Sequence, residues 1–226
     1  MDETDRPAYE PTPSSNHADL PTPRLSAFRR LIAAFYAPGE VFEDIRIKPT
    51  WLVVLLAMTI LTVAAQAIVF QKMDTEGTMR ARLGDRAEEL SDEQIETMVE
   101  RGRKVARFVP VITAVVIPVM WAVLAGIFFL MLKMVGSETD YVHTLSATLH
   151  SYWPPSVVAS VLVVLLIQRV DSITEQELPN IVKSHLGVLL PADAPGWLNG
   201  VASTFSVFNV WTLVLLVIGF KIVGRL

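Results

Sequence analysis

Cysteine is absent from the 226 residues of this chain. Its absence excludes disulfides, thiolate metal ligands and thiol catalysis, but it leaves the cellular compartment open. Charged side chains are also absent from four long stretches, at 51–70, 108–132, 141–168 and 194–220. Each meets or exceeds the roughly 20 residues that a helix needs to cross about 30 Å of hydrocarbon. The stretches predict membrane-spanning helices rather than a buried soluble bundle, whose helices usually carry charge on a face that meets water.

The charges that the chain does carry lie between these stretches. Charged residues make up 19% of the chain, although 52% is hydrophobic and the mean hydropathy is +0.44. This segregation predicts an all-α, polytopic transmembrane helical bundle with about four spans, preceded by interfacial amphipathic helices. A net charge of only −4 gives no field that would attract nucleic acid. The expected spans cover residues 51–70, 109–132, 145–168 and 203–223.

The first 23 residues differ in composition from the rest. They hold five prolines among acidic and small polar residues. They lack the basic start and apolar stretch of a signal peptide. We therefore expect a disordered, proline-rich tail over 1–23 and a membrane domain over 24–226.

A short amphipathic segment follows the tail at 24–36. Arg29 and Arg30 lie largely off its apolar face, which predicts an interfacial helix whose basic residues contact lipid phosphates. The alternative is a short helix packed on the bundle. The apolar face comprises Leu25, Phe28, Leu31, Ile32 and Phe35.

The segment between the first two expected spans is polar and rich in both signs of charge. Ser91 and Gln94 have the spacing of a capping box, which predicts that a helix begins there. Nothing in the sequence firmly stops this helix, so we expect one long helix over about 91–135. A basic cluster precedes the second span and suits either lipid phosphates or a solvated helix end. It consists of Arg101, Arg103, Lys104 and Arg107.

Prolines occur inside two of the expected spans. Pro118 removes a backbone hydrogen bond from the second span and is predicted to act as a hinge there. A third span that began only at Trp153 would have about 15 apolar residues, too few to cross. We therefore expect this span to begin near Leu145 and to carry Pro154 and Pro155 inside it, with their freed backbone groups bonded by neighbours.

The expected spans contain no side chain suited to catalysis or ion coupling. The nearest candidates are His143 and His150 near one end of the third span, and about 10 Å along the helix axis separates the two. A single metal ion would hardly reach both, and no further ligand pair accompanies them. Phosphate-binding loops, nucleophile elbows and zinc-protease motifs are also missing. The sequence therefore predicts a non-enzymatic protein without a cofactor or metal site.

Four polar side chains in or near the spans allow two interpretations. They could line a polar cavity beside the kinked helices. Alternatively, the polar residues of the spans act only as hydrogen-bonding groups between packed helices, an interpretation that applies to Gln66, Asn209, Thr212 and Gln168. Pairs of small residues, such as Ala122 with Gly126, favour close helix packing because both members share one helix face. The four candidate cavity residues are Gln66, His150, Tyr152 and Asn209.

Several short motifs occur in an order that resembles the YIP-domain (Ypt/Rab-interacting protein) family in its bacterial form. The resemblance covers roughly 31–226 and implies a polytopic bundle with a cytoplasmic N-terminus. Eukaryotic relatives act in vesicle trafficking with small GTPases and supply no catalytic residues. The family usually has five spans, so either this sequence is truncated or another copy completes its bundle. The motifs are FYAPGEVFEDI (35–45), PTW (49–51), YVHTL (141–145), YWPP (152–155), PGWL (195–198), FNVW (208–211) and GF (219–220).

Basic residues are almost equally numerous on the two sides of the expected bundle, so charge alone hardly sets its orientation. The long charged tail favours an N-terminus inside a bacterial cytoplasmic membrane. The leading functional hypothesis is a non-enzymatic scaffold or adaptor that contacts membrane lipids and a membrane protein partner or a second copy. The alternative is a transporter, channel or lipid-handling protein with a solvated cavity between the second, third and fourth spans.

Overall fold

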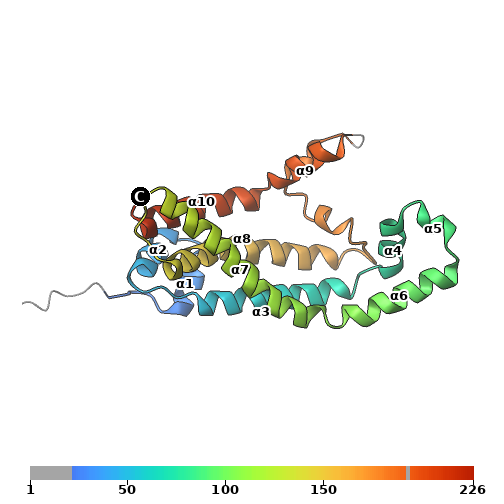
Figure 1. Cartoon of the computed structure of the whole chain (residues 1–226), viewed down its shortest axis with the longest axis horizontal. Coiled ribbons are helices and arrows are strands. Elements are labelled where there is room, and N and C mark those ends of the chain that lie inside the picture. Colours follow the sequence, from blue (N-terminus) through green and yellow to red (C-terminus); the bar gives the residue numbers. More distant parts are fainter. Residues whose placement is uncertain (1–21, 192–193) are drawn as a thin grey trace, which may run out of the picture.

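The computed structural model describes residues 22–191 and 194–226, so the predicted tail lies almost wholly outside the described residues. The described residues form helices and no strands, apart from two isolated bridges. Four helices are long and apolar enough to cross a membrane, which confirms the predicted all-α membrane bundle (Figure 1). They are α3 (Leu52–Phe70), α7 (Val109–Met134), α8 (Tyr141–Ile167) and α10 (Val207–Gly224).

The shorter helices gather at opposite ends of this bundle (Figure 1). The α1–α2 end carries α1 (Ala27–Ala33), α2 (Pro38–Ile47), the connection 135–140 and the carboxyl terminus. The α4–α6 end carries a helical projection and the connection between α8 and α10. Its elements are α4 (Thr75–Leu83), α5 (Arg86–Glu89), α6 (Asp92–Ala106), η1 (Leu178–Asn180), η2 (Leu186–Leu189) and α9 (Gly196–Thr204).

Helix α8 is the centre of the bundle and packs against α3, α7 and α10. Every residue from Thr144 to Ser151 is at most 8% exposed. Thr148, in this buried half, donates its hydroxyl to the carbonyl of Thr144 in its own helix at 2.8 Å. Ser151 donates in the same way to Ala147. Thr148 and Ser151 are thus buried at low cost, because each hydroxyl has a partner. The buried Ser146 hydroxyl, in contrast, has no hydrogen-bond partner among the described residues.

The third span carries its two prolines inside one continuous helix, as predicted. It begins at Tyr141, four residues before the expected start. The Asp140 side chain caps it by accepting from the His143 backbone N–H at 2.9 Å. Pro154 and Pro155 are both buried within this helix. The second span likewise continues through Pro118.

The prediction of one long helix over 91–135 is wrong. The capping box of Ser91 and Gln94 is present and starts α6, but that helix ends at Ala106. A new helix, α7, starts at Val109 with Pro110 in its first turn. Proline has no N–H to donate and disfavours helical geometry in the residue before it, so it suits a helix start and interrupts a continuing helix. The charged projection and the apolar span therefore become separate helices.

Candidate functional site

The α1–α2 end is built around a buried ion pair between two short helices. Arg30 of α1 and Asp44 of α2 are 1% and 3% exposed, and their charged groups approach to 3.3 Å. The Asp44 carboxylate also accepts the backbone N–H groups of Arg24 and Leu25, at 2.8 and 2.7 Å. These bonds fix the chain segment before α1 onto α2. The carboxylate is therefore fully occupied by partners from the chain itself.

The Arg30 guanidinium is equally well bonded. It donates to the Lys48 carbonyl and the Thr50 hydroxyl, both at 2.7 Å, and to the Asp44 carbonyl at 3.3 Å. Burial lowers the pKa of Arg30, and the carboxylate of Asp44 opposes this effect. The predicted contact of Arg30 with lipid phosphates is wrong, because this side chain faces the protein interior. Arg29, its neighbour, is exposed, and its predicted lipid contact stays a prediction.

Both interpretations of the segment 24–36 describe part of α1. Its inner face packs on the bundle through Leu31, whose carbonyl accepts the Trp153 indole N–H at 3.0 Å. Its outer face is apolar and open, with Phe28 and Ile32 both more than half exposed. An exposed apolar helix face beside a span suits the interfacial region of a bilayer. Helix α1 thus packs on the bundle through one face, and the interfacial role of its other face stays a prediction.

The four polar residues predicted to share a cavity are not brought together. Gln66 of α3 accepts a hydrogen bond from Thr113 of α7 at 3.0 Å. The His150 ring lies fully buried, with Nδ1 2.8 Å from the Ser146 carbonyl of its own helix. Both residues therefore have local partners within the packed bundle.

The other two residues also have separate partners. The Tyr152 ring packs edge-on against Trp121 of α7, with centroids 4.7 Å apart. The Asn209 side chain donates to the Thr204 carbonyl at 2.7 Å and so stabilises the bend between α9 and α10. This pattern agrees with packing between helices rather than with one polar chamber. Within the described part of the chain, no three potential metal ligands lie together.

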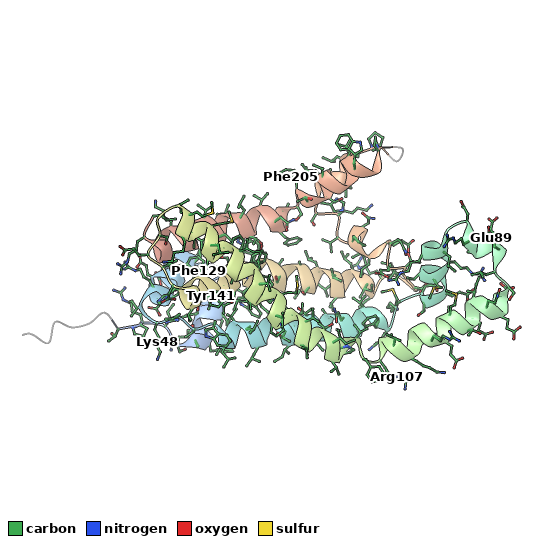
Figure 2. The ribbon with its side chains drawn as sticks, viewed as in Figure 1. Lys48, Glu89, Arg107, Phe129, Tyr141 and Phe205 are labelled. Atoms are coloured by element: carbon green, nitrogen blue, oxygen red, sulfur yellow. The ribbon has the colours of Figure 1, made fainter. Side chains whose placement is uncertain are left out.

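Close packing of α7 on α8 uses the predicted pair of small residues. The Tyr141 hydroxyl of α8 donates to the Ala122 carbonyl at 2.9 Å. A Cβ atom on Gly126 would lie 4.0 Å from the same tyrosine ring. Figure 2 shows Phe129 of α7 beside Tyr141, and their ring centroids are 6.1 Å apart. The small residues thus leave room for this aromatic side chain.

The α4–α6 end contains an open groove that the sequence analysis missed. Its volume is about 1130 Å³, and it lies between α4, the end of α6 and the adjoining ends of α3 and α7. Arg103 and Arg107 line the groove, whereas Lys104 pairs with Glu100 at 2.9 Å on the surface. Figure 2 shows Arg107 at the turn between α6 and α7. The groove forms because α4 folds back along α6, which local sequence patterns do not reveal.

Comparison with known proteins agrees with this architecture. The model of the Yip1 domain matches residues 32–226. The chain is similar to membrane protein YknW of Bacillus subtilis (strain 168), with 29% identity over 196 residues, 86% of this chain and 78% of that protein. No solved structure matches it significantly. The matched range agrees with the resemblance over 31–226 that the sequence motifs carry. The chain belongs to the Yip1-domain family of membrane proteins.

Proposed function

We propose that this protein is a non-enzymatic scaffold or adaptor of a bacterial cytoplasmic membrane, with its N-terminus inside. In this role it holds membrane lipids together with a membrane protein partner or a second copy of itself. The observation that carries the proposal is the dense packing around the first half of α8. Yip1-domain proteins are not a known family of enzymes, which agrees with a structural role.

The packing around α8 argues against the alternative of a transporter or channel. That alternative requires a solvated cavity between α7, α8 and α10. Residues Thr144 to Ser151 are instead at most 8% exposed, so no water-filled path runs along this half of α8. Phe128 of α7 and Phe220 of α10 pack edge-on with centroids 5.3 Å apart, so these two helices also contact each other directly. A rigid, well-packed core suits a protein that presents surfaces to partners.

The outer face of α7 is the surface best suited to a partner helix. Its exposed apolar residues recur along nearly the whole span, and each is at least half exposed. In a membrane such a face contacts lipid tails or another helix, and van der Waals packing decides between them. The residues of this face include Val111, Val115, Val119, Met120, Val123, Ile127, Leu130 and Met134.

Extraction of the full chain from its native membrane in lipid nanodiscs, followed by mass spectrometry, tests the proposal. A stoichiometric protein partner or a defined homo-oligomer is the expected result. A chain recovered only as a monomer with lipid would contradict the scaffold role. A photo-crosslinking residue at Val119, compared with one at the outward-facing Leu56 of α3, then tests whether the partner contacts α7.

The proposed orientation has an independent test, because the chain contains no cysteine. Single cysteines at the exposed positions Ser26 and Glu89 report the α1–α2 end and the α4–α6 end. In intact cells a membrane-impermeant maleimide is expected to label Glu89→Cys and to spare Ser26→Cys. The reverse pattern would place the N-terminus outside.

A further inference from the structure

The groove at the α4–α6 end lies where the spans leave the hydrocarbon. Its inner wall includes Val69 and Phe70 in the last turn of α3, and Val109 and Pro110 in the first turn of α7. Phe108, between α6 and α7, is 59% exposed and adds apolar surface at the same level. Lipid glycerol groups and the upper parts of acyl chains occupy this level of a bilayer. The groove is therefore placed to receive a lipid rather than a solute from bulk water.

The outer walls of the groove are also largely apolar. Met73 and Met79 project from the α4 side, and Val105 and Ala106 face them from α6. Gly102 of α6 faces Met79 of α4, since a Cβ there would lie 4.0 Å from the terminal methyl of Met79, at ordinary contact distance. Methionine side chains adapt to irregular apolar ligands. The volume of about 1130 Å³ exceeds the roughly 300–1,000 Å³ of common ligand pockets, so part of an acyl chain fits.

Helix α4, which forms one wall, is held in place by the segment that follows α8. Ile173 exchanges backbone hydrogen bonds with the start of the α4 region, accepting from Asp74 and donating to Lys72, at 2.8 and 2.9 Å. Its side chain packs in a cluster with Val69 and Ile167. The backbone N–H of Glu175 donates to the Thr78 hydroxyl at 3.1 Å. The groove is thus a built feature of the fold.

The charges around the groove favour an anion. Arg82, Arg103 and Arg107 line it, and Glu175 is the one lining carboxylate. Glu175 pairs with Arg82, which leaves two arginines. Among the described residues, no carboxylate forms an ion pair with Arg103 or Arg107, and both are exposed. Guanidinium groups bind phosphate through paired hydrogen bonds. Two arginines without ion-pair partners, next to an apolar wall, are therefore the arrangement expected of a phospholipid-binding site.

We propose that this groove binds one anionic phospholipid from the leaflet at the α4–α6 end. Its phosphate bonds to Arg103 and Arg107, and its glycerol and upper acyl chain pack against Met73, Met79 and Val105. The proposal goes beyond the scaffold function and does not depend on it. It also divides the basic cluster of α6, because Arg101 lies outside the groove and Lys104 is paired with Glu100.

The test is native mass spectrometry of the full chain released from nanodiscs that contain phosphatidylglycerol or phosphatidylcholine. One retained phosphatidylglycerol per chain is expected, with much weaker retention of phosphatidylcholine. The double variant Arg103→Gln with Arg107→Gln is expected to lower that retention by roughly 30-fold, as expected for two arginines at an anionic surface. Arg101→Gln is the matched control on the same helix and leaves retention unchanged.

A second variant tests the groove without removing charge. Gly102→Leu places a side chain between α4 and α6 and is expected to lower phosphatidylglycerol retention several-fold, while leucine also favours the helix more than glycine does. Equal retention by wild type, the double arginine variant and Gly102→Leu would overturn the proposal. Displacement of the lipid by inorganic phosphate would also overturn the proposal, because it would indicate a site for free phosphate. A peptide bound in the groove would overturn it as well. Partner capture is a separate measurement, so failure here leaves the scaffold proposal intact.

Discussion

Arg30 at the α1–α2 end and Arg103 at the α4–α6 end have the same side chain in opposite surroundings. Arg30 is buried and bonded to Asp44, Lys48 and Thr50, so its guanidinium group is not accessible to a ligand. Arg103 is exposed beside an apolar groove and has no ion-pair partner among the described residues. The comparison teaches that arginines near membrane spans are not interchangeable. Whether one stabilises the fold or faces a ligand depends on its acidic neighbours in space.

The largest expected effect comes from breaking the buried ion pair. Arg30→Ala leaves the Asp44 carboxylate buried without its charged partner, which is expected to destabilise the fold by about 3–5 kcal/mol. Thermal unfolding of the full chain in detergent measures the loss. Arg29→Ala is the matched control, because that neighbour is exposed. If Arg30→Ala lowers the stability no more than Arg29→Ala does, the buried ion pair does not stabilise the α1–α2 end.

The next largest effect is expected from overpacking the contact between α2 and α10 at the α1–α2 end. A Cβ atom on Gly219 of α10 would lie 2.8 Å from the ring of Phe42, which is itself 1% exposed. Gly219→Ala is therefore expected to cost about 1–3 kcal/mol through overpacking. Gly39→Ala in α2 is the control, because no atom lies within 4 Å of its added Cβ. Equal unfolding temperatures for the two variants would show that α2 and α10 separate easily.

Asp140 gives a smaller effect with a defined pH dependence. Burial by itself raises the pKa of Asp140, but hydrogen bonds from His143 outweigh it and hold this pKa below its usual value. A lowered folded pKa stabilises the protein above about pH 4 and loses that contribution as the pH falls through the folded value. Asp140→Ala is expected to cost about 1 kcal/mol at pH 7 as a lost helix cap.

Unfolding temperatures of wild type and Asp140→Ala between pH 3 and pH 7 test this sign. The difference between them should shrink toward the acid end, where the carboxyl group of the wild type becomes protonated. A difference that grows with acidity would contradict the assignment of Asp140 as an ionised cap. Asp140→Asn retains a capping oxygen and should lie between the two at neutral pH.

The smallest effect is expected at the α4–α6 end. Arg80 pairs with Glu76 and Asp92, each at 3.0 Å, but these side chains are 42%, 59% and 95% exposed. Exposed ion pairs contribute at most about 1 kcal/mol, so Arg80→Ala should change the unfolding temperature little. If Arg80→Ala lowers the unfolding temperature as much as Arg30→Ala does, both ends depend equally on their ion pairs. That result would contradict the difference between the two ends.

The sequence predicted the features that depend on neighbours along the chain. Gaps in charge located the four spans, the spacing of Ser91 and Gln94 located the start of α6, and the span length required Pro154 and Pro155 inside α8. Each of these follows from local geometry or from the thickness of a bilayer. The Yip1-domain match likewise agrees with motifs that were visible in order along the chain.

Features that depend on distant residues escaped prediction. The burial of Arg30 depends on Asp44, which lies on another helix, so amphipathic patterning alone placed that arginine outside. The groove depends on α4 folding back along α6 and on its anchoring by Ile173, about 100 residues further along the chain. The break before α7 does have local signals, since Pro110 lies in the first turn of α7 and basic residues lie in the last turn of α6.

Hydrogen exchange of the full chain in nanodiscs, with phosphatidylglycerol or with phosphatidylcholine, tests the contrast between the two ends most directly. Amides of α1, α2 and the first half of α8 should exchange slowly in both lipids, because packing and the Arg30–Asp44 pair hold them closed. Amides of α4 and of α6 around Arg103 should exchange faster and slow only with phosphatidylglycerol. Equal exchange at both ends, or a lipid response confined to α1 and α2, would contradict the account.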